Sequence, residues 1–322
     1  MPKVSVVVPV YGVEKYIDRC ARSLFEQTLE EVEFIFVDDC TPDRSVEILR
    51  EVLAEYPSRI PQTRIERMPT NSGQATVRRH GVQFATGDYI IHCDSDDWVE
   101  KDWLEKLYAK AAAENLDVCI CDYRRATDDS FEEGVKCFYE DEDCLTSLLR
   151  CRITGAVWNK LVRREFYQSP DFIWPTMNFN EDYVCSFQIV TKAARIGYVP
   201  EPLYNYYRNS QSIVAGSTRA KVLEKQRQNI ANYKIVEGLY NICSRNAEYR
   251  DAFLTYKLAV KNGIRPYVKD PEILRFWRRT FPGLGLEIWH SRYITLRMRI
   301  AYISTYIGMF PLFSHTKEFE DA

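Results

Sequence analysis

Residues 89–97 read Tyr-Ile-Ile-His-Cys-Asp-Ser-Asp-Asp, and this short stretch combines the two features that decide the expected fold. Its first five residues form an apolar run of the length expected for a strand buried inside a sheet. Three aspartates follow within four residues, so the expected strand ends at a strongly polar loop. In open parallel sheets, ligands bind beyond the carboxyl ends of the strands, and these aspartates are therefore candidate site residues.

The chain before this stretch alternates between two kinds of pattern. We expect strands at residues 3–8, 34–37 and 63–66, and helices at residues 13–25, 45–55 and 74–85. Strands that alternate with helices in this way predict an α/β protein with a mostly parallel sheet and helices on both faces.

The chain after the stretch continues less regularly. We expect helices at residues 102–114 and 182–194, strands at 117–121 and 158–162, and a loop or edge hairpin at 128–142. Pro200 and Pro202 interrupt residues 198–207, which we interpret as an edge strand because proline cannot donate a ladder hydrogen bond. From residue 219 onward one helix follows another. We therefore expect a first domain at residues 1–215 and a helical C-terminal region at 216–322.

Length and composition set outer limits on the function. The 322 residues are 46% hydrophobic and 28% charged, as in folded soluble proteins. The net charge of −3 argues against a wholly basic nucleic-acid binder. The charge is unevenly spread, however, because residues 1–256 sum to −8 and residues 257–299 sum to +7.

Several features predict a cytoplasmic protein. The N-terminus has no signal-peptide pattern, and no apolar run reaches the roughly 18 residues of a membrane-spanning helix. The ten cysteines form no Cys-x-x-Cys pair, so we expect buried thiols in a reducing compartment and no zinc ribbon.

Aspartates cluster at two expected strand ends. Asp38 and Asp39 follow the second strand, and Asp94 and Asp96 follow the fourth. Each could simply cap the next helix, a role in which aspartate is favourable. Two carboxylate clusters at neighbouring strands repel each other, however, unless a cation neutralises them. A divalent ion such as Mn²⁺ or Mg²⁺ prefers oxygen ligands of this kind and shares its remaining positions with water and phosphate.

Two common phosphate-binding motifs are absent from the sequence. It has neither Gly-x-Gly-x-x-Gly after the first strand nor the Gly-x₄-Gly-Lys-Ser/Thr loop. This argues against a nicotinamide-dependent dehydrogenase and against a P-loop enzyme. A parallel sheet that binds a nucleotide through carboxylates and a metal points instead to nucleotide-sugar chemistry.

Five ordered sequence blocks carry a family resemblance. They are residues 8–12 (Val-Pro-Val-Tyr-Gly), 23–28 (Ser-Leu-Phe-Glu-Gln-Thr), 37–43 (Val-Asp-Asp-Cys-Thr-Pro-Asp), 71–81 with Asn71, Gly73, Arg78 and Gly81, and 85–97. In these blocks the chain resembles the family 2 glycosyltransferases, which have a GT-A fold. Three later blocks, at residues 158–161, 181–182 and 203–208, resemble the acceptor side of the members that build bacterial surface polysaccharides.

The resemblance implies roles for the residues of these blocks. Pro9 and Tyr11 would line the nucleotide pocket, Asp39 would accept a hydrogen bond from the uracil base, and Asp38 would support the turn beside it. Arg78 would reach the diphosphate, where its permanent charge is useful.

The block at residues 94–97 would complete the donor site. The resemblance implies that Asp94 meets the ribose or a metal-bound water, with Ser95 beside it. Asp96, helped by Asp94, would bind the metal that bridges the two phosphates. Some relatives supply a histidine as a further metal ligand, but residues 208–212 contain none, so the remaining ligands stay open.

The pair Glu181-Asp182 has two interpretations. Acidic residues in the first turn of a helix are favourable in themselves. The resemblance instead implies a general base for the acceptor hydroxyl, which would be Asp182, with Glu181 as the alternative. Attack by a single activated hydroxyl would invert the anomeric centre. A double displacement needs a nucleophile on the other face of the sugar, and we identify none from the sequence.

The basic C-terminal region lies outside these blocks. Its arginines alternate with aromatic residues, and residues 300–313 form an apolar run too short to span a bilayer. We expect it to bind an anionic membrane surface, with a partner subunit or a solvated face as alternatives.

The sequence as a whole predicts a metal-dependent inverting glycosyltransferase, peripheral on the inner face of the cell membrane. It would move a sugar from a UDP donor to a growing cell-surface glycan or a lipid-linked acceptor, and we expect no nucleic-acid partner. A catalytically inactive nucleotide-sugar-binding or assembly protein is the alternative.

Overall fold

The chain forms two compact units in a computed structural model that describes residues 1–127, 130–208, 218–243 and 247–309. The first unit comprises residues 1–144 and 155–210, and the second comprises residues 145–154 and 211–322. Residues 145–154 thus group with the second unit although they lie within the expected first domain. The expected boundary at residue 215 lies outside the described residues.

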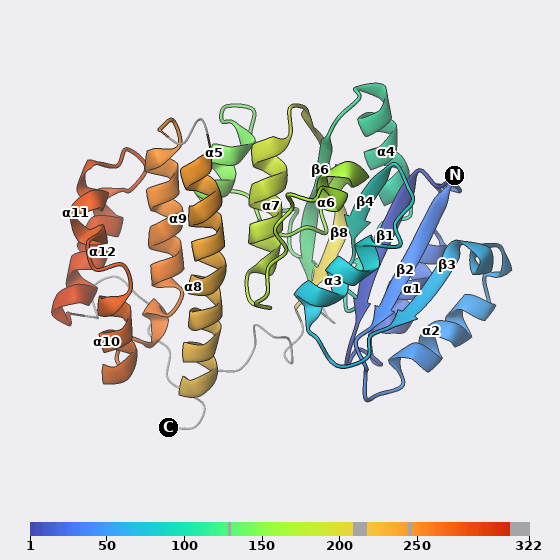
Figure 1. Cartoon of the computed structure of the whole chain (residues 1–322), viewed down its shortest axis with the longest axis horizontal. Coiled ribbons are helices and arrows are strands. Elements are labelled where there is room, and N and C mark those ends of the chain that lie inside the picture. The colour runs from blue at the N-terminus through green and yellow to red at the C-terminus, as the bar shows by residue number, and fades with distance from the viewer. Residues whose placement is uncertain (128–129, 209–217, 244–246, 310–322) are drawn as a thin grey trace. The chain divides into compact units, whose positions relative to one another are not determined.

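The first half of the sheet in the first unit is parallel. It contains β1 (Val4–Val10), β2 (Val32–Asp38), β3 (Thr63–Arg67) and β4 (Tyr89–His92), in the spatial order β3-β2-β1-β4 (Figure 1). Each strand lies within two residues of its expected bounds. Because the strands are parallel, their carboxyl ends meet at one edge, which is where the aspartate clusters follow β2 and β4.

The second half of the sheet is mixed. β7 (Lys160–Arg163) runs antiparallel to β4 and to β6 (Val118–Ala126), which in turn pairs in parallel with β8 (Ile196–Tyr207). The expected edge position of residues 198–207 is wrong, because the two-residue strand β5 (Trp98–Val99) pairs antiparallel with the end of β8. The two prolines instead lie where the β6–β8 register shifts. A local irregularity tolerates proline as an edge does, so the sequence cannot distinguish the two.

Helices connect these strands. The first unit contains α1 (Ile17–Phe25), α2 (Ser45–Ala54), the 3₁₀ helix η1 (Pro57–Gln62), α3 (Gln74–Val82), α4 (Trp103–Ala113), α6 (Arg164–Gln168) and α7 (Glu181–Lys192). The acidic segment after β6 is joined to that strand by two isolated bridges, Tyr123 to Val135 and Ala126 to Phe131. The first two residues of the expected loop or hairpin, 128 and 129, lie outside the described residues.

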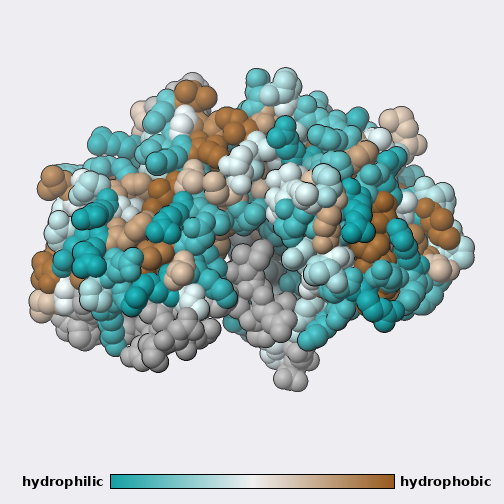
Figure 2. Space-filling model, turned by 60° about the horizontal axis from the view of Figure 1, so that its bottom comes forward, coloured by the Kyte–Doolittle hydropathy of each residue, from teal (hydrophilic) through white to brown (hydrophobic). Residues whose placement is uncertain are grey.

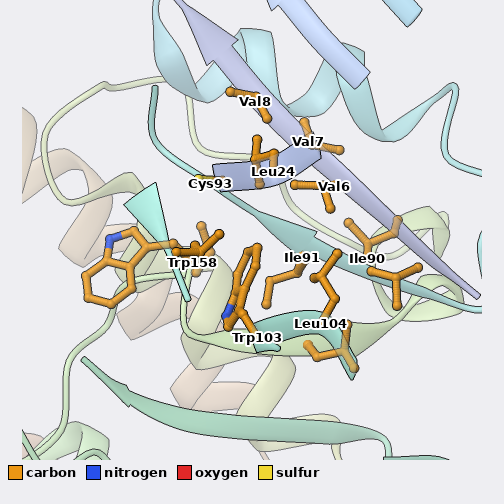
Figure 3. Packing of buried hydrophobic residues seen from close by; sticks show 14 of the residues in the cluster. Val6, Val7, Val8, Leu24, Ile90, Ile91, Cys93, Trp103, Leu104 and Trp158 are labelled. Carbon is orange, nitrogen blue, oxygen red and sulfur yellow. The ribbon is translucent and has the colours of Figure 1, made fainter. Parts of the chain in front are cut away.

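The core of the first unit forms where β1 and β4 contact the helices. Figure 3 shows the valines of β1 and the isoleucines of β4 packed with Leu24 of α1 and with Trp103 and Leu104 of α4. Gly81 brings α3 close to this core, because a Cβ atom there would lie 2.6 Å from Val7 Cγ1. Glycine is required for this close approach, which also sets the depth at which Arg78, one turn earlier, enters the protein.

The described residues of the second unit form helices joined by turns and loops and contain no strand. It contains α5 (Cys144–Leu149, of which Cys144 is assigned to the first unit), α8 (Arg219–Ile242), α9 (Arg250–Asn262), η2 (Arg265–Tyr267), α10 (Pro271–Arg279), α11 (Leu284–Glu287), η3 (Ile288–His290) and α12 (Leu296–Ile307). Its core includes Ile273, Trp277 and Leu284. No helix among the described residues is long and apolar enough to cross a membrane. Figure 2 shows one face of the molecule, where hydrophilic residues separate smaller hydrophobic patches.

Candidate active site

The loops at the carboxyl ends of β1 and β2 are tied to each other. Gly12 N donates to Thr41 Oγ1 (2.9 Å), and Asp38 Oδ1 accepts a hydrogen bond from Thr41 N (2.8 Å). Asp38 therefore supports the turn, and Thr41 links that turn to the loop that carries the exposed Tyr11. Pro9 is half-buried near the end of β1, on the same edge of the sheet.

Cys40 occupies a strained position in this turn. Its φ angle is +57°, in the left-handed region that favours glycine. Its Sγ donates to Met68 O (2.9 Å), a contact that glycine could not make.

Asp39 fixes the start of α3. It is buried, and its two carboxylate oxygens accept hydrogen bonds from Ser72 N (2.7 Å) and Gly73 N (2.8 Å). A carboxylate has about four acceptor positions, so these two bonds leave room for a further donor. The first role of Asp39 is thus to anchor the segment that leads to Arg78.

Arg78 lies at the centre of a cluster of charges. Its Nη1 contacts Glu181 Oε1 and Asp182 Oδ1, each at 2.6 Å, and its Nη2 contacts Asp94 Oδ1, also at 2.6 Å. α3, the loop after β4 and the start of α7 each contribute to this cluster, which unites residues up to 104 positions apart. We refer to Arg78, Asp94, Glu181 and Asp182 as the charge cluster.

The charge cluster is largely shielded from solvent, which changes its proton affinities. Burial opposes a charge on Arg78, but the three carboxylates outweigh this and raise its pKa well above the usual value. Burial raises the pKa of Asp182 to about 8, although the charge of Arg78 opposes the shift. A carboxylate with such a pKa can exchange a proton near neutral pH.

Asp182 and Glu181 differ in accessibility. The Asp182 side chain is 19% exposed and that of Glu181 is 6% exposed. Glu181 Oε1 also accepts a hydrogen bond from Gln74, the first residue of α3. Gln74 was not a candidate in the sequence, because no motif spacing connects it with residue 181.

Asp97 holds the loop that follows β4. It is fully buried, and its carboxylate accepts hydrogen bonds from the Tyr204 hydroxyl (2.6 Å) and from Tyr207 N (2.7 Å). The Tyr204 oxygen in turn accepts a bond from Asp94 N (3.0 Å). Asp97 therefore helps to position Asp94 through the Tyr204 hydroxyl. The block at residues 203–208 was the signal for Tyr204, but its sequence did not reveal this partner.

Asp94 and Asp96 have the chemistry of a metal site completed by other ligands. Both are half-buried, and burial together with the charge of Asp94 raises the pKa of Asp96 to about 6. This mutual repulsion would be relieved by a cation. Within the described part of the chain, no group of three or more His, Cys, Asp or Glu side chains could hold a metal. The two aspartates fit Mg²⁺ or Mn²⁺ if phosphate and water supply the remaining ligands.

The other candidates lie nearby or have structural partners. Ser95 is buried within the same loop. Lys160, in the block at residues 158–161, is buried and donates to Ala156 O (2.7 Å) and Asn159 Oδ1 (2.9 Å). Trp158 stacks on Tyr204 with ring centroids 4.3 Å apart, so this block supports the Tyr204 anchor from one side.

Comparison with known proteins gives a consistent result. Residues 5–179 match the family model described as glycosyl transferase family 2. Two proteins of Bacillus subtilis (strain 168) named glycosyltransferases, EpsH and EpsJ, are 33% and 31% identical over 222 residues. Each match covers 66% of this chain and 63% of the relative, so the match leaves more than a third of these relatives uncovered.

Solved structures share the fold at low sequence identity. Residues 1–349 of TarS from S. aureus, in complex with UDP-GlcNAc, match with a TM-score of 0.59 and 17% identity over 94% of this chain and 92% of that chain. The mannosyltransferase PcManGT from Pyrobaculum calidifontis, in complex with GDP-Man and Mn²⁺, matches with a TM-score of 0.55 and 14% identity over 96% and 87% of the two chains. The expected GT-A fold with a helical C-terminal region is confirmed.

Proposed function

Because this chain belongs to glycosyl transferase family 2, we propose that it transfers a sugar from a nucleotide donor to a hydroxyl group and inverts the anomeric centre. The observation that carries the proposal is the charge cluster, which brings a partly exposed carboxylate of raised pKa beside a candidate metal-binding loop. The alternative of an inactive binding protein would not require a carboxylate poised near neutral pH.

We assign the donor to the edge formed by β1, β2 and β4. Pro9 and Tyr11 would line the nucleotide pocket, and the acceptor positions left on Asp39 would receive the N–H of a uracil base. UDP-GlcNAc is bound by TarS and GDP-Man by PcManGT, so the fold alone admits either nucleotide. The choice of UDP therefore rests on the sequence blocks.

Asp96, with Asp94, would hold Mn²⁺ or Mg²⁺, which when bound would neutralise the charge that develops on the departing diphosphate. Asp97 and Tyr204 hold the backbone of Asp94 in this loop. Arg78 would add a permanent positive charge beside Asp94, and any contact with a phosphate would have to compete with its three carboxylate partners.

Asp182 would accept the proton of the acceptor hydroxyl. Its side chain is more exposed than that of Glu181. Glu181 Oε1 accepts hydrogen bonds from both Gln74 and Arg78. The contact with Arg78 holds the Asp182 carboxylate in one orientation, so the base is positioned before the acceptor arrives. Direct attack by that hydroxyl on the donor would give a product of inverted configuration.

The acceptor in this proposal is a growing cell-surface glycan or a lipid-linked saccharide. The enzyme would then work at the cytoplasmic side of a membrane, and the basic second unit would bring it there. The named activities of the relatives vary, and a cholesterol galactosyltransferase of Borreliella burgdorferi is 27% identical over 79% of this chain.

The proposal is tested by donor turnover. Purified protein is incubated with a panel of UDP- and GDP-sugars and Mn²⁺, released nucleotide is measured, and thermal shifts report binding. We expect one donor to be turned over, and Asp96→Ala to abolish this while the surface variant Asp102→Asn does not. NMR of the product anomer tests inversion. Binding without turnover would favour the inactive alternative, and turnover that persists in EDTA would overturn the role of the metal.

A further inference from the structure

Helix α12 of the second unit carries its aliphatic residues on the outside. Leu296, Ile300, Ile303 and Ile307 are between 39% and 62% exposed. Their spacing of four, three and four residues places them on one side of the helix, within about 60° at 3.6 residues per turn. We call these four residues the aliphatic stripe.

The opposite side of α12 makes the contacts with its own unit. Ala301, Tyr302 and Thr305 are buried there, and the Tyr302 ring packs 5.1 Å from that of Trp277 in α10. The helix is thus fixed by a small and partly polar face, while its most hydrophobic face is left uncovered by the described residues. Amphipathic helices of soluble domains usually have the reverse arrangement.

Positive charge lies near the stripe. Arg297 is exposed beside it on α12, and Arg275 and Arg279 are exposed on α10. Arg299, on the other flank of the stripe, is half-buried and donates to Ser291 O (2.7 Å). Arg278 of α10 donates to the carbonyl of Tyr306 (2.8 Å), which shows that the two helices are adjacent. The sequence gives the second unit a net charge of +10 and the first unit −13.

We propose that the aliphatic stripe inserts into the surface of an anionic lipid bilayer, with the flanking arginines on the lipid phosphates. This deepens the proposed function, on which the choice of a membrane partner rests. A helix of 12 residues is about 18 Å long, so it would lie in the interface and would not cross a hydrocarbon core of about 30 Å.

The chemistry of the surface favours lipid over protein. Centres of protein interfaces are enriched in Trp, Tyr and Arg, and leucine is under-represented among their energetic hot spots, whereas the centre of this stripe is entirely Leu and Ile. A second copy of the unit would also bring two charges of +10 together, which is unfavourable at the ionic strength of a cell. An anionic bilayer offers both an apolar interior and the opposite charge.

The structure also changes which residues of the region can meet lipid. Trp277 and Tyr302, two of the aromatic residues that suggested a membrane surface, are buried in the core of the unit. Trp289 and Tyr306 remain exposed and could lie at the headgroup level beside the stripe. The isoleucines of the aliphatic stripe, which belong to the apolar run at residues 300–313, are therefore better positions than these aromatic residues for testing contact with lipid.

The test is cosedimentation of the full chain with vesicles of phosphatidylcholine mixed with phosphatidylglycerol, and with vesicles of phosphatidylcholine alone. We expect binding to the mixed vesicles, weakened by salt, and a loss of roughly tenfold or more in Ile303→Glu and Ile300→Glu. The matched control is Ile242→Glu, an exposed isoleucine at the end of α8 in the same unit. Arg297→Glu should weaken binding to the mixed vesicles only.

Two results would overturn the proposal: equal binding by Ile303→Glu and the control, or no binding of the wild-type chain to the mixed vesicles. In the second case, a dimer that Ile303→Glu dissociates would assign the stripe to a second copy of the chain. Thermal unfolding of each variant verifies that it is folded. Donor turnover in the absence of vesicles separates this proposal from the previous one. Ile303→Glu should retain that turnover. If the proposed enzymatic function is wrong, neither the wild-type chain nor any variant will turn over a donor, whether or not it binds lipid.

Discussion

Two buried cations, Arg78 in the first unit and Lys261 in the second, are held in opposite ways. In the first unit Arg78 is neutralised by three carboxylates from distant elements. In the second unit Lys261 donates to two carbonyl oxygens, those of Trp277 (2.7 Å) and Thr280, and lies over the Trp277 ring at 4.4 Å. Lys261 thus satisfies the carboxyl end of α10, where a cation is favourable.

Under the proposed function, this difference separates a catalytic arrangement from a structural one. Lys261 completes the hydrogen bonds of a helix end and needs no further partner. The charge cluster carries a net negative charge and presents two of its carboxylates to solvent, as a site for a cation and an acceptor would.

The largest expected effect is on catalysis. Asp182→Asn should lower donor-to-acceptor transfer by about 10²–10⁴-fold, because a positioned base contributes that much. Glu181→Gln should lower it less, since Glu181 is the more buried and acts through Gln74 and Arg78. Rates are measured on folded protein, as verified by circular dichroism. If Glu181→Gln is the more damaging variant, the two residues exchange roles.

The second prediction concerns the stability of the first unit. Arg78→Met should destabilise it by about 3–5 kcal/mol, because buried carboxylates lose their partner. Arg79→Met is the matched control, one residue along the same helix but exposed, and it should change the free energy of unfolding little. Urea unfolding of the two variants measures the difference. Equal stabilities would show that the carboxylates are neutralised in some other way.

The third prediction is that pH acts on the two units with opposite sign. The folded pKa of Asp96 is raised to about 6 from an ordinary value of 3.8, so the folded state keeps a proton that the unfolded chain loses. This contribution to stability is therefore lost as pH rises through that window. Burial lowers the pKa of Lys261 from 10.5 to about 8, so the folded state loses a proton that the unfolded chain keeps. The contribution of Lys261 to stability therefore increases as pH rises from 8 to 10.5.

Matched variants, studied in metal-free buffer, isolate the pH-dependent contributions of Asp96 and Lys261 to the free energy of unfolding. The stability of Asp96→Asn relative to wild type should increase between pH 4 and 6, and that of Lys261→Met relative to wild type should decrease between pH 8 and 10.5. Calorimetry at several pH values measures both. A flat difference for either variant would show that its parent residue has an ordinary pKa.

The smallest effect concerns backbone strain. Cys40 in the first unit and Phe281 in the second both have φ angles in the left-handed region. Cys40→Gly should stabilise the protein by up to about 1 kcal/mol, because the strain outweighs a weak thiol hydrogen bond. Phe281→Gly should destabilise it by about 2 kcal/mol, because its ring packs 4.7 Å from that of Tyr233. Thermal shifts of opposite sign would confirm that only packing distinguishes the two positions.

Much of the first unit could be predicted because its signals are local. Apolar runs predicted the strands β1 and β2, and acids at the ends of β2 and β4 predicted the polar edge. The mixed half of the sheet could not be predicted in the same way. The direction of β7 and the place of β8 depend on pairing with strands far along the chain, and a proline looks the same at an edge as at a register shift.

The candidate site was predicted as a set of residues but not as a network. Asp94, Arg78 and Asp182 were each identified, but nothing in their spacing indicated that one guanidinium contacts all three acids of the cluster. Gln74, Asp97 and Tyr204 were assigned no role, because their function is to hold other residues, and such a role has no local signature.

By itself the sequence determined the alternating strands and helices of the first 93 residues, the acidic character of one edge and the basic character of the second unit, because these follow from composition and short-range periodicity. Only the tertiary structure decided that Arg78 lies among carboxylates and that the aliphatic face of α12 points outward. Both depend on which surfaces of distant segments pack together. A helix with two usable faces buries the one that fits its neighbours, and here Tyr302 fits against Trp277 while the isoleucines do not.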